Sequence, residues 1–97
     1  MIEPTENGVR ITGPMLTANA HGLLTAGRVF LAGLPASALC VVDLSPVSEA
    51  DSSSLSVVFA WLRTARQLGV DVRVAHPPAS MLSLAALYGV SDTLPLV

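Results

Sequence analysis

The sequence has few charged residues, a single cysteine and no long uninterrupted apolar run. Charged residues make up 12% of its 97 residues, which is about half the share of a typical globular domain. The five basic residues are scattered along the chain, and this argues against a nucleic-acid-binding protein. Because Cys40 is the only cysteine, no disulfide can form within one chain, which favours a reducing compartment.

No apolar run approaches the roughly 18 residues of a membrane span. Residues 1–10 are polar and lack the basic start and apolar stretch of a signal peptide. We therefore expect a cytoplasmic protein that contacts a membrane only through partners. Hydrophobic residues are 52% of the chain, so we expect some exposed apolar surface, and partner binding is its ordinary explanation. A composition rich in Ala and Val is the alternative explanation.

The titratable residues do not form a recognisable catalytic or metal-binding pattern. His21 and His76 are far apart and have no accompanying cluster of cysteines or carboxylates, so we predict no metal site and no cofactor. Ser53, His76 and Asp51 supply the residue types of a hydrolytic triad, but nothing orients the histidine or provides an oxyanion hole. We therefore predict that the protein is not an enzyme and has no catalytic residues. Cys40 is expected to act as a small apolar core residue.

Alternating and periodic apolar residues predict an α/β domain. The expected elements are a strand over 9–12, a helix over 17–33, a strand over 39–44, a helix over 52–68, a strand over 70–74, a helix over 79–88 and a short final strand over 94–97. Asn19 is the expected N-cap of the first helix, and Gly33, Gly69 and Gly89 are the expected stop signals. The continuous apolar run 39–44 is typical of a strand buried on both faces.

The most informative segment joins the strand over 39–44 to the helix over 52–68. It places Asp51-Ser52-Ser53-Ser54 at the start of that helix, where unpaired N–H groups and the helix dipole favour a phosphate or an acidic partner surface. Asp51 and Ser52 either cap the helix alone or also contact a partner. The expected apolar face of this helix consists of Val57, Val58, Trp61, Leu62, Ala65 and Leu68. Ser56 and Arg63 lie opposite that face, and Phe59 lies at its edge.

These residues resemble the STAS-domain family, whose members include anti-sigma factor antagonists. The resemblance rests on Val41-Val42-Asp43-Leu44-Ser45, on Asp51-Ser52-Ser53-Ser54-Leu55, and on Val70-Asp71-Val72-Arg73-Val74. It implies a single STAS-like domain over residues 1–97, in which a mixed sheet of about four to five strands packs with three to four helices. The ending Leu84-Ala85-Ala86-Leu87-Tyr88-Gly89-Val90 is most similar to the small STAS subunits of Mla-type phospholipid ABC transporters.

The resemblance implies a non-catalytic protein that binds and stabilises or regulates the ATPase subunit of such a transporter. This would place it on the inner face of the inner membrane through the transporter complex. The implied partner-binding residues are Asp51, Ser52, Ser53, Ser56, Phe59 and Arg63. Ser53 also matches the usual phosphoacceptor of the antagonist branch, with Ser52 as a second candidate. A phospho-switched anti-sigma factor antagonist, with an anti-sigma factor kinase as partner, is therefore the alternative function.

Overall fold

The computed structural model describes residues 1–97 and contains four strands, three α-helices and one short 3₁₀ helix. The strands are β1 (Ile2–Thr5), β2 (Gly8–Ile11), β3 (Leu39–Asp43) and β4 (Asp71–Ala75). The helices are α1 (Thr17–Ala32), α2 (Ser52–Leu68) and α3 (Ala79–Leu87), followed by the 3₁₀ turn η1 (Ser91–Thr93). The predicted α/β class is confirmed.

The four strands form one mixed sheet in the order β1-β2-β3-β4. Strands β1 and β2 are antiparallel and form a hairpin, whereas β2, β3 and β4 run parallel to one another. Parallel neighbours require crossover connections, and α1 and α2 supply them. The predicted final strand is reduced to a single parallel bridge between Leu96 and Val74.

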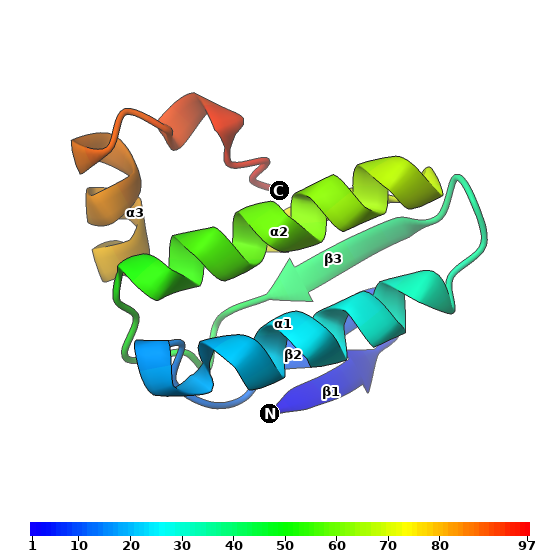
Figure 1. The fold of residues 1–97 in the computed structure, drawn as a ribbon, viewed down its shortest axis with the longest axis horizontal. Coiled ribbons are helices and arrows are strands. Elements are labelled where there is room, and N and C mark those ends of the chain that lie inside the picture. Colours follow the sequence, from blue (N-terminus) through cyan, green and yellow to red (C-terminus); the bar gives the residue numbers. More distant parts are fainter.

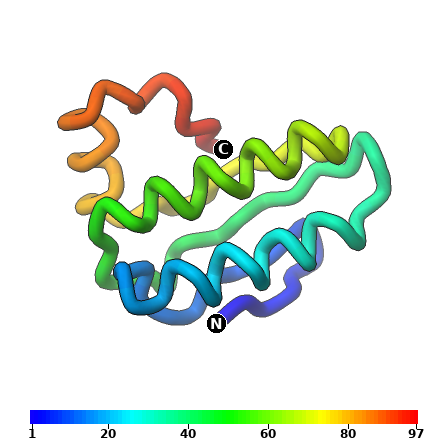
Figure 2. The backbone as a smooth tube through the Cα atoms, in the orientation of Figure 1, coloured from blue at the N-terminus to red at the C-terminus, as the bar shows by residue number.

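Helices α1 and α2 lie side by side over one face of the sheet, and both begin at the same end of the molecule (Figure 1). The tube in Figure 2 shows α3 across the N-terminal end of α2, with the two chain termini on opposite sides of the helix pair. The core lies between this helix pair and the sheet. Its best-buried side chains include Ile11, Leu23, Val42, Val58 and Val74.

The prediction that the strand over 39–44 is buried on both faces is wrong. Cys40 and Val42 are buried under the helices, but Leu39 is 55% exposed and Asp43 is only half-buried. Successive side chains of a strand point to opposite faces, and here the helices cover one face. The other face carries charged residues and is open to solvent, as the exposed Arg10 and Arg73 show.

Two further local predictions need correction. Strand β1 is absent from the sequence prediction, because four residues that include a proline give no clear strand pattern. Its pairing with β2 through the register Ile2↔Ile11 creates the strand. Asn19 is not the N-cap of α1: Leu16 holds that position, and the Asn19 side chain accepts a hydrogen bond from the Leu16 backbone N–H at 3.4 Å. Asn19 therefore supports the same helix end from its first turn.

Helix α2 matches its predicted bounds and most of its predicted face. Val57, Val58, Trp61 and Ala65 are buried, whereas Leu62 is half-buried and Leu68 is 38% exposed. Leu68 is exposed because it is the last helical residue. Gly69, the predicted stop signal, has a left-handed conformation with φ 73°, and its N–H donates to the last turn.

Candidate functional site

The N-terminal ends of α1 and α2 meet at Asp51. Asp51 is the N-cap of α2, and its Oδ1 accepts a hydrogen bond from the Ser53 backbone N–H at 2.9 Å. Its Oδ2 accepts from the backbone N–H of Thr17 at 3.0 Å and from the Thr17 hydroxyl at 3.1 Å. One carboxylate thus satisfies free donors at the start of two helices. The predicted capping role of Asp51 is confirmed and extends to α1.

The hydroxyl groups around Asp51 differ in what they bind. The Oγ atoms of Thr17 and Ser53 are 2.8 Å apart. Thr17 has a single hydroxyl proton, so when it donates to Asp51, the Ser53 hydroxyl donates to Thr17. Ser54 is buried and donates to the Asp51 carbonyl oxygen at 2.7 Å. Ser52, by contrast, is exposed at the first position of the helix, so its hydroxyl faces solvent.

Backbone donors lower the pKa of Asp51. The Thr17 N–H contributes most, and the Ser53 N–H and the Thr17 hydroxyl add to it. These donors bind the ionised carboxylate better than the protonated one. The site is therefore an anionic cap at neutral pH, framed by the positive ends of two helix dipoles.

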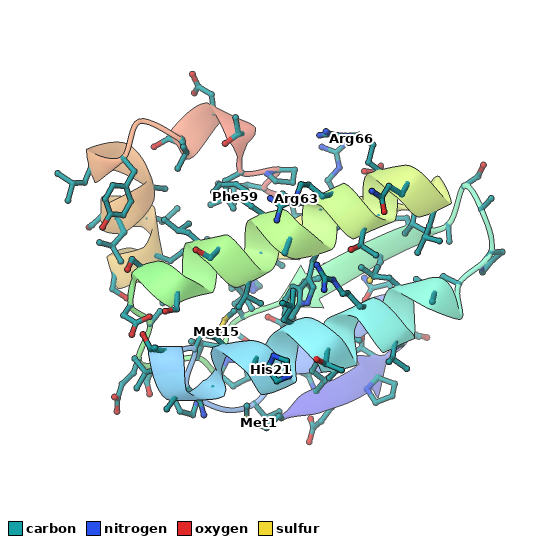
Figure 3. All side chains as sticks on the ribbon, in the orientation of Figure 1. Met1, Met15, His21, Phe59, Arg63 and Arg66 are labelled. Carbon is teal, nitrogen blue, oxygen red and sulfur yellow. The ribbon has the colours of Figure 1, made fainter.

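A shallow groove runs along the first turns of α2, and we call it the α2–α3 groove. It is lined by Ser52, Ser53, Leu55, Ser56, Phe59, Tyr88 and Val90. Four of the six partner-binding residues predicted from the sequence therefore line one surface feature, with Asp51 directly beside them. Phe59 is half-buried; Figure 3 shows it on α2, on the side away from α1.

Arg63, the sixth predicted residue, lies outside the α2–α3 groove. It lines the seam between α1 and α2 together with Arg28 and His21. Ser56 borders both surfaces. The predicted site thus divides into an uncharged groove beside α3 and a basic seam beside α1.

Sequence reasoning missed Thr17 and assigned no role to Tyr88. Thr17 lies at the start of α1, and no pattern in the chain connects it with Asp51. The link comes from the preceding loops, in which Met15 forms a parallel bridge with Ala50. Tyr88 is 57% exposed at the end of α3 and reaches the groove because α3 lies across the start of α2. The sequence pattern predicts that α3 is a helix, but it does not show where α3 packs against α2.

His76 lies with Asp43 and not with Ser53. Its Nδ1 is 3.6 Å from Asp43 Oδ1, and Arg10 Nε is 3.2 Å from Asp43 Oδ2. The backbone N–H of Ser45 lowers the pKa of Asp43 most strongly, and Arg10 and His76 act in the same direction. The triad considered from residue types therefore does not assemble: His76 faces Asp43, and the Ser53 hydroxyl binds Thr17.

Comparisons with known proteins agree with this architecture. Residues 2–97 match the family model described as "Mlab, STAS domain". The intermembrane phospholipid transport system binding protein MlaB of Haemophilus influenzae is 36% identical over 50 residues, which are 52% of this chain and 48% of that protein. The aligned part thus spans about half the length of the curated relative it matches.

Two solved structures share the fold at low sequence identity. A proposed anti-sigma factor antagonist from Thermotoga maritima gives a TM-score of 0.76 at 19% identity, covering 99% of this chain and 83% of that one. The unphosphorylated anti-sigma factor antagonist SpoIIAA gives 0.69 at 13% identity, covering 99% and 84%. At such identities the likeness concerns the fold.

Proposed function

This chain belongs to the MlaB family of STAS domains, and from that premise we propose that it is a non-catalytic subunit that binds the ATPase of an Mla-type phospholipid ABC transporter. In this proposal it stabilises or regulates the ATPase, while the ATP belongs to the partner. The resemblance to the STAS family that the sequence indicated is confirmed by the family match and by the relative in Haemophilus influenzae.

The α2–α3 groove carries the proposal. It gathers Ser52, Ser53, Ser56 and Phe59 on one open surface at the start of α2. Its charge-free lining, with the half-buried Phe59 ring and the exposed Tyr88 ring, has the character of an interface core, where aromatic residues are enriched and charges are rare. We propose this groove as the docking surface for the ATPase.

The proposed location follows from the proposed partner. None of the helices combines the length and apolar character needed to cross a bilayer. We propose that the protein lies at the cytoplasmic face of the inner membrane because the transporter complex holds it there. Contact with the membrane would then be made by the permease and not by this chain.

Co-purification with the ABC ATPase encoded nearest this gene tests the docking surface. We expect wild type to form a stable complex and Ser52→Glu to lose it, because a charged side chain would enter an uncharged groove. Thr25→Glu is the matched control, since Thr25 is exposed on α1 and lines neither groove nor seam. Unchanged affinity of folded Ser52→Glu would refute the docking surface, and failure of wild type to bind would refute the proposed partner.

A phospho-switched anti-sigma factor antagonist is the second candidate function. The exposed Ser52 and half-buried Ser53 at the start of α2 support it, and the fold neighbours carry that name. Against it, the Ser53 hydroxyl binds Thr17, and a phosphate there would lie beside the Asp51 carboxylate, which repels it. Incubation with an anti-sigma factor kinase, followed by mass spectrometry, distinguishes the two functions. Stoichiometric phosphate on either serine would favour the antagonist over the transporter subunit.

A further inference from the structure

The charged residues are distributed unevenly between the two faces of the domain. The acidic residues are Glu3, Glu6, Asp43, Glu49, Asp51, Asp71 and Asp92, and none of them lies within α1 or α2. The two helices instead carry Arg28, Arg63 and Arg66, together with His21. The chain has a net charge of −2, yet its helical layer is basic. This asymmetry is a property of the fold, because the basic residues are scattered in the sequence.

Arg28 and Arg63 both line the seam between the two helices. The seam forms an open groove lined by Ala20, His21, Leu24 and Arg28 from α1 and by Ser56, Val57, Ala60 and Arg63 from α2. Arg28 lies seven residues after His21 in α1, and Arg63 lies seven residues after Ser56 in α2. Because the helices start together at Asp51, this spacing places the two arginines at corresponding positions along their helices.

Neither arginine has a carboxylate partner within the protein. The ion pairs of the domain involve Arg10, Arg73 and His76, which lie on or beside the sheet. The nearest acidic residue to the seam along α2 is Asp51, and its carboxylate is already held by Thr17 and Ser53. Two like charges in one groove repel each other, so an anion bound between them would relieve that repulsion.

We propose that the seam groove binds an acidic segment of the ATPase partner, with carboxylates paired to Arg28 and Arg63. The small side chains of Ala20, Ser56 and Ala60 leave room for a backbone to approach. Arginine suits this task because its planar guanidinium binds a carboxylate through two parallel hydrogen bonds. The inference rests on the proposed function, because it names the chemistry of the partner segment beside the α2–α3 groove.

An anionic membrane surface is the competing occupant, and the groove fits it less well. Recognition of anionic lipids by surface charge uses clusters of about four to eight basic residues, whereas this groove offers two arginines and one histidine. Its position favours a protein: Ser56 borders both the seam and the α2–α3 groove, so one partner can cover both.

Charge reversal with a matched control tests the inference. Arg28→Glu and Arg63→Glu are compared with Arg66→Glu, because Arg66 is an exposed arginine of the same helix that lines a different groove, beside Thr93 and Pro95. Figure 3 shows Arg66 directed away from α1. Affinity for the ATPase is measured at low and at high salt. We expect each seam variant to bind about tenfold more weakly at low salt, and the Arg66 variant to match wild type.

The remaining outcomes separate this inference from the proposed function. Arg63→Lys should bind more tightly than Arg63→Glu but more weakly than wild type, since the positive charge remains while the paired hydrogen bonds of the guanidinium are lost. One outcome refutes the seam inference alone: wild type binds the ATPase, Ser52→Glu does not bind it, and both seam variants bind as tightly as wild type. The proposed function then stands. If wild type does not bind the ATPase, both fail. A different outcome would assign the seam to lipid: wild type binds phosphatidylglycerol vesicles, the seam variants do not, and all of them bind the ATPase equally well. This result would refute the acidic protein segment as the occupant of the seam.

Discussion

Thr17 donates two hydrogen bonds to Asp51, although the two residues are 34 positions apart in the chain. Its backbone N–H and its hydroxyl both reach Oδ2, at 3.0 and 3.1 Å. Through this carboxylate the start of α1 is fixed to the start of α2, beside the proposed docking surface. The position of Ser52 and Ser53 therefore depends on a residue of another helix.

Removing the Thr17 hydroxyl should destabilise the domain without altering its shape. Thr17→Val keeps the side-chain volume but loses the hydroxyl bonds to Asp51 and Ser53. We expect a loss of about 1 kcal/mol of unfolding free energy, measured by urea denaturation, and Thr17→Ser should behave like wild type. Equal stability of the Val and Ser variants would show that the hydroxyl bonds contribute nothing.

Acid should destabilise the domain through Asp51 and Asp43. Both carboxyl groups have a folded-state pKa below the ordinary value, Asp51 mainly because of the Thr17 N–H and Asp43 mainly because of the Ser45 N–H. Their stabilisation is complete above the unfolded pKa of about 4 and is lost as the pH falls through the lowered folded pKa.

Denaturation midpoints measured between neutral pH and pH 2 test this dependence. We expect a flat profile near neutrality and a steep fall below about pH 4. Asp51→Asn should start less stable at neutral pH and lose less stability on acidification. A profile of this variant parallel to that of wild type would exclude Asp51 as a contributor.

The Trp61 side chain of α2 packs directly against Gly27 of α1. A Cβ atom on Gly27 would overlap with Trp61 Nε1, and that Nε1–H donates to the Leu23 carbonyl oxygen at 3.2 Å. Gly27→Ala should therefore cost about 1–3 kcal/mol, because the indole ring must shift within a packed core.

Gly22→Ala is the matched control for this substitution. Gly22 lies in the same helix, is exposed, and has nothing within 4 Å of an added Cβ. Alanine at this position should stabilise the helix by up to about 1 kcal/mol. Thermal unfolding followed by the fluorescence of Trp61 measures both variants. Destabilisation by both substitutions would point to the helix itself and not to the indole contact.

Cys40 should react slowly in the folded protein. Its side chain is buried, and burial raises the pKa of the thiol, so little of the reactive thiolate is present. Labelling with a chromogenic disulfide reagent should be slow in buffer and fast in denaturant. Fast labelling of the folded protein would show that β3 opens readily.

The sequence pattern predicted the elements that carry strong local signals. Helix α2 was predicted to its exact bounds, because Asp51 and Gly69 mark its ends and its apolar residues recur with helical period. Strand β1 has no such signal, since its four residues, Ile2-Glu3-Pro4-Thr5, become a strand only by pairing with β2. The final strand was reduced to the bridge of Leu96 with Val74, because Pro95 has no N–H to extend the pairing.

The sequence by itself determined the α/β class, the family resemblance and the group of hydroxyl residues beside Asp51, because each depends on residues near one another in the chain. Only the tertiary structure decided that Thr17 shares the Asp51 carboxylate, that Tyr88 joins the groove and that Arg28 and Arg63 line the same seam. These relationships join residues of different elements. They arise from how the helices pack on the sheet, and local periodicity contains no information about that packing.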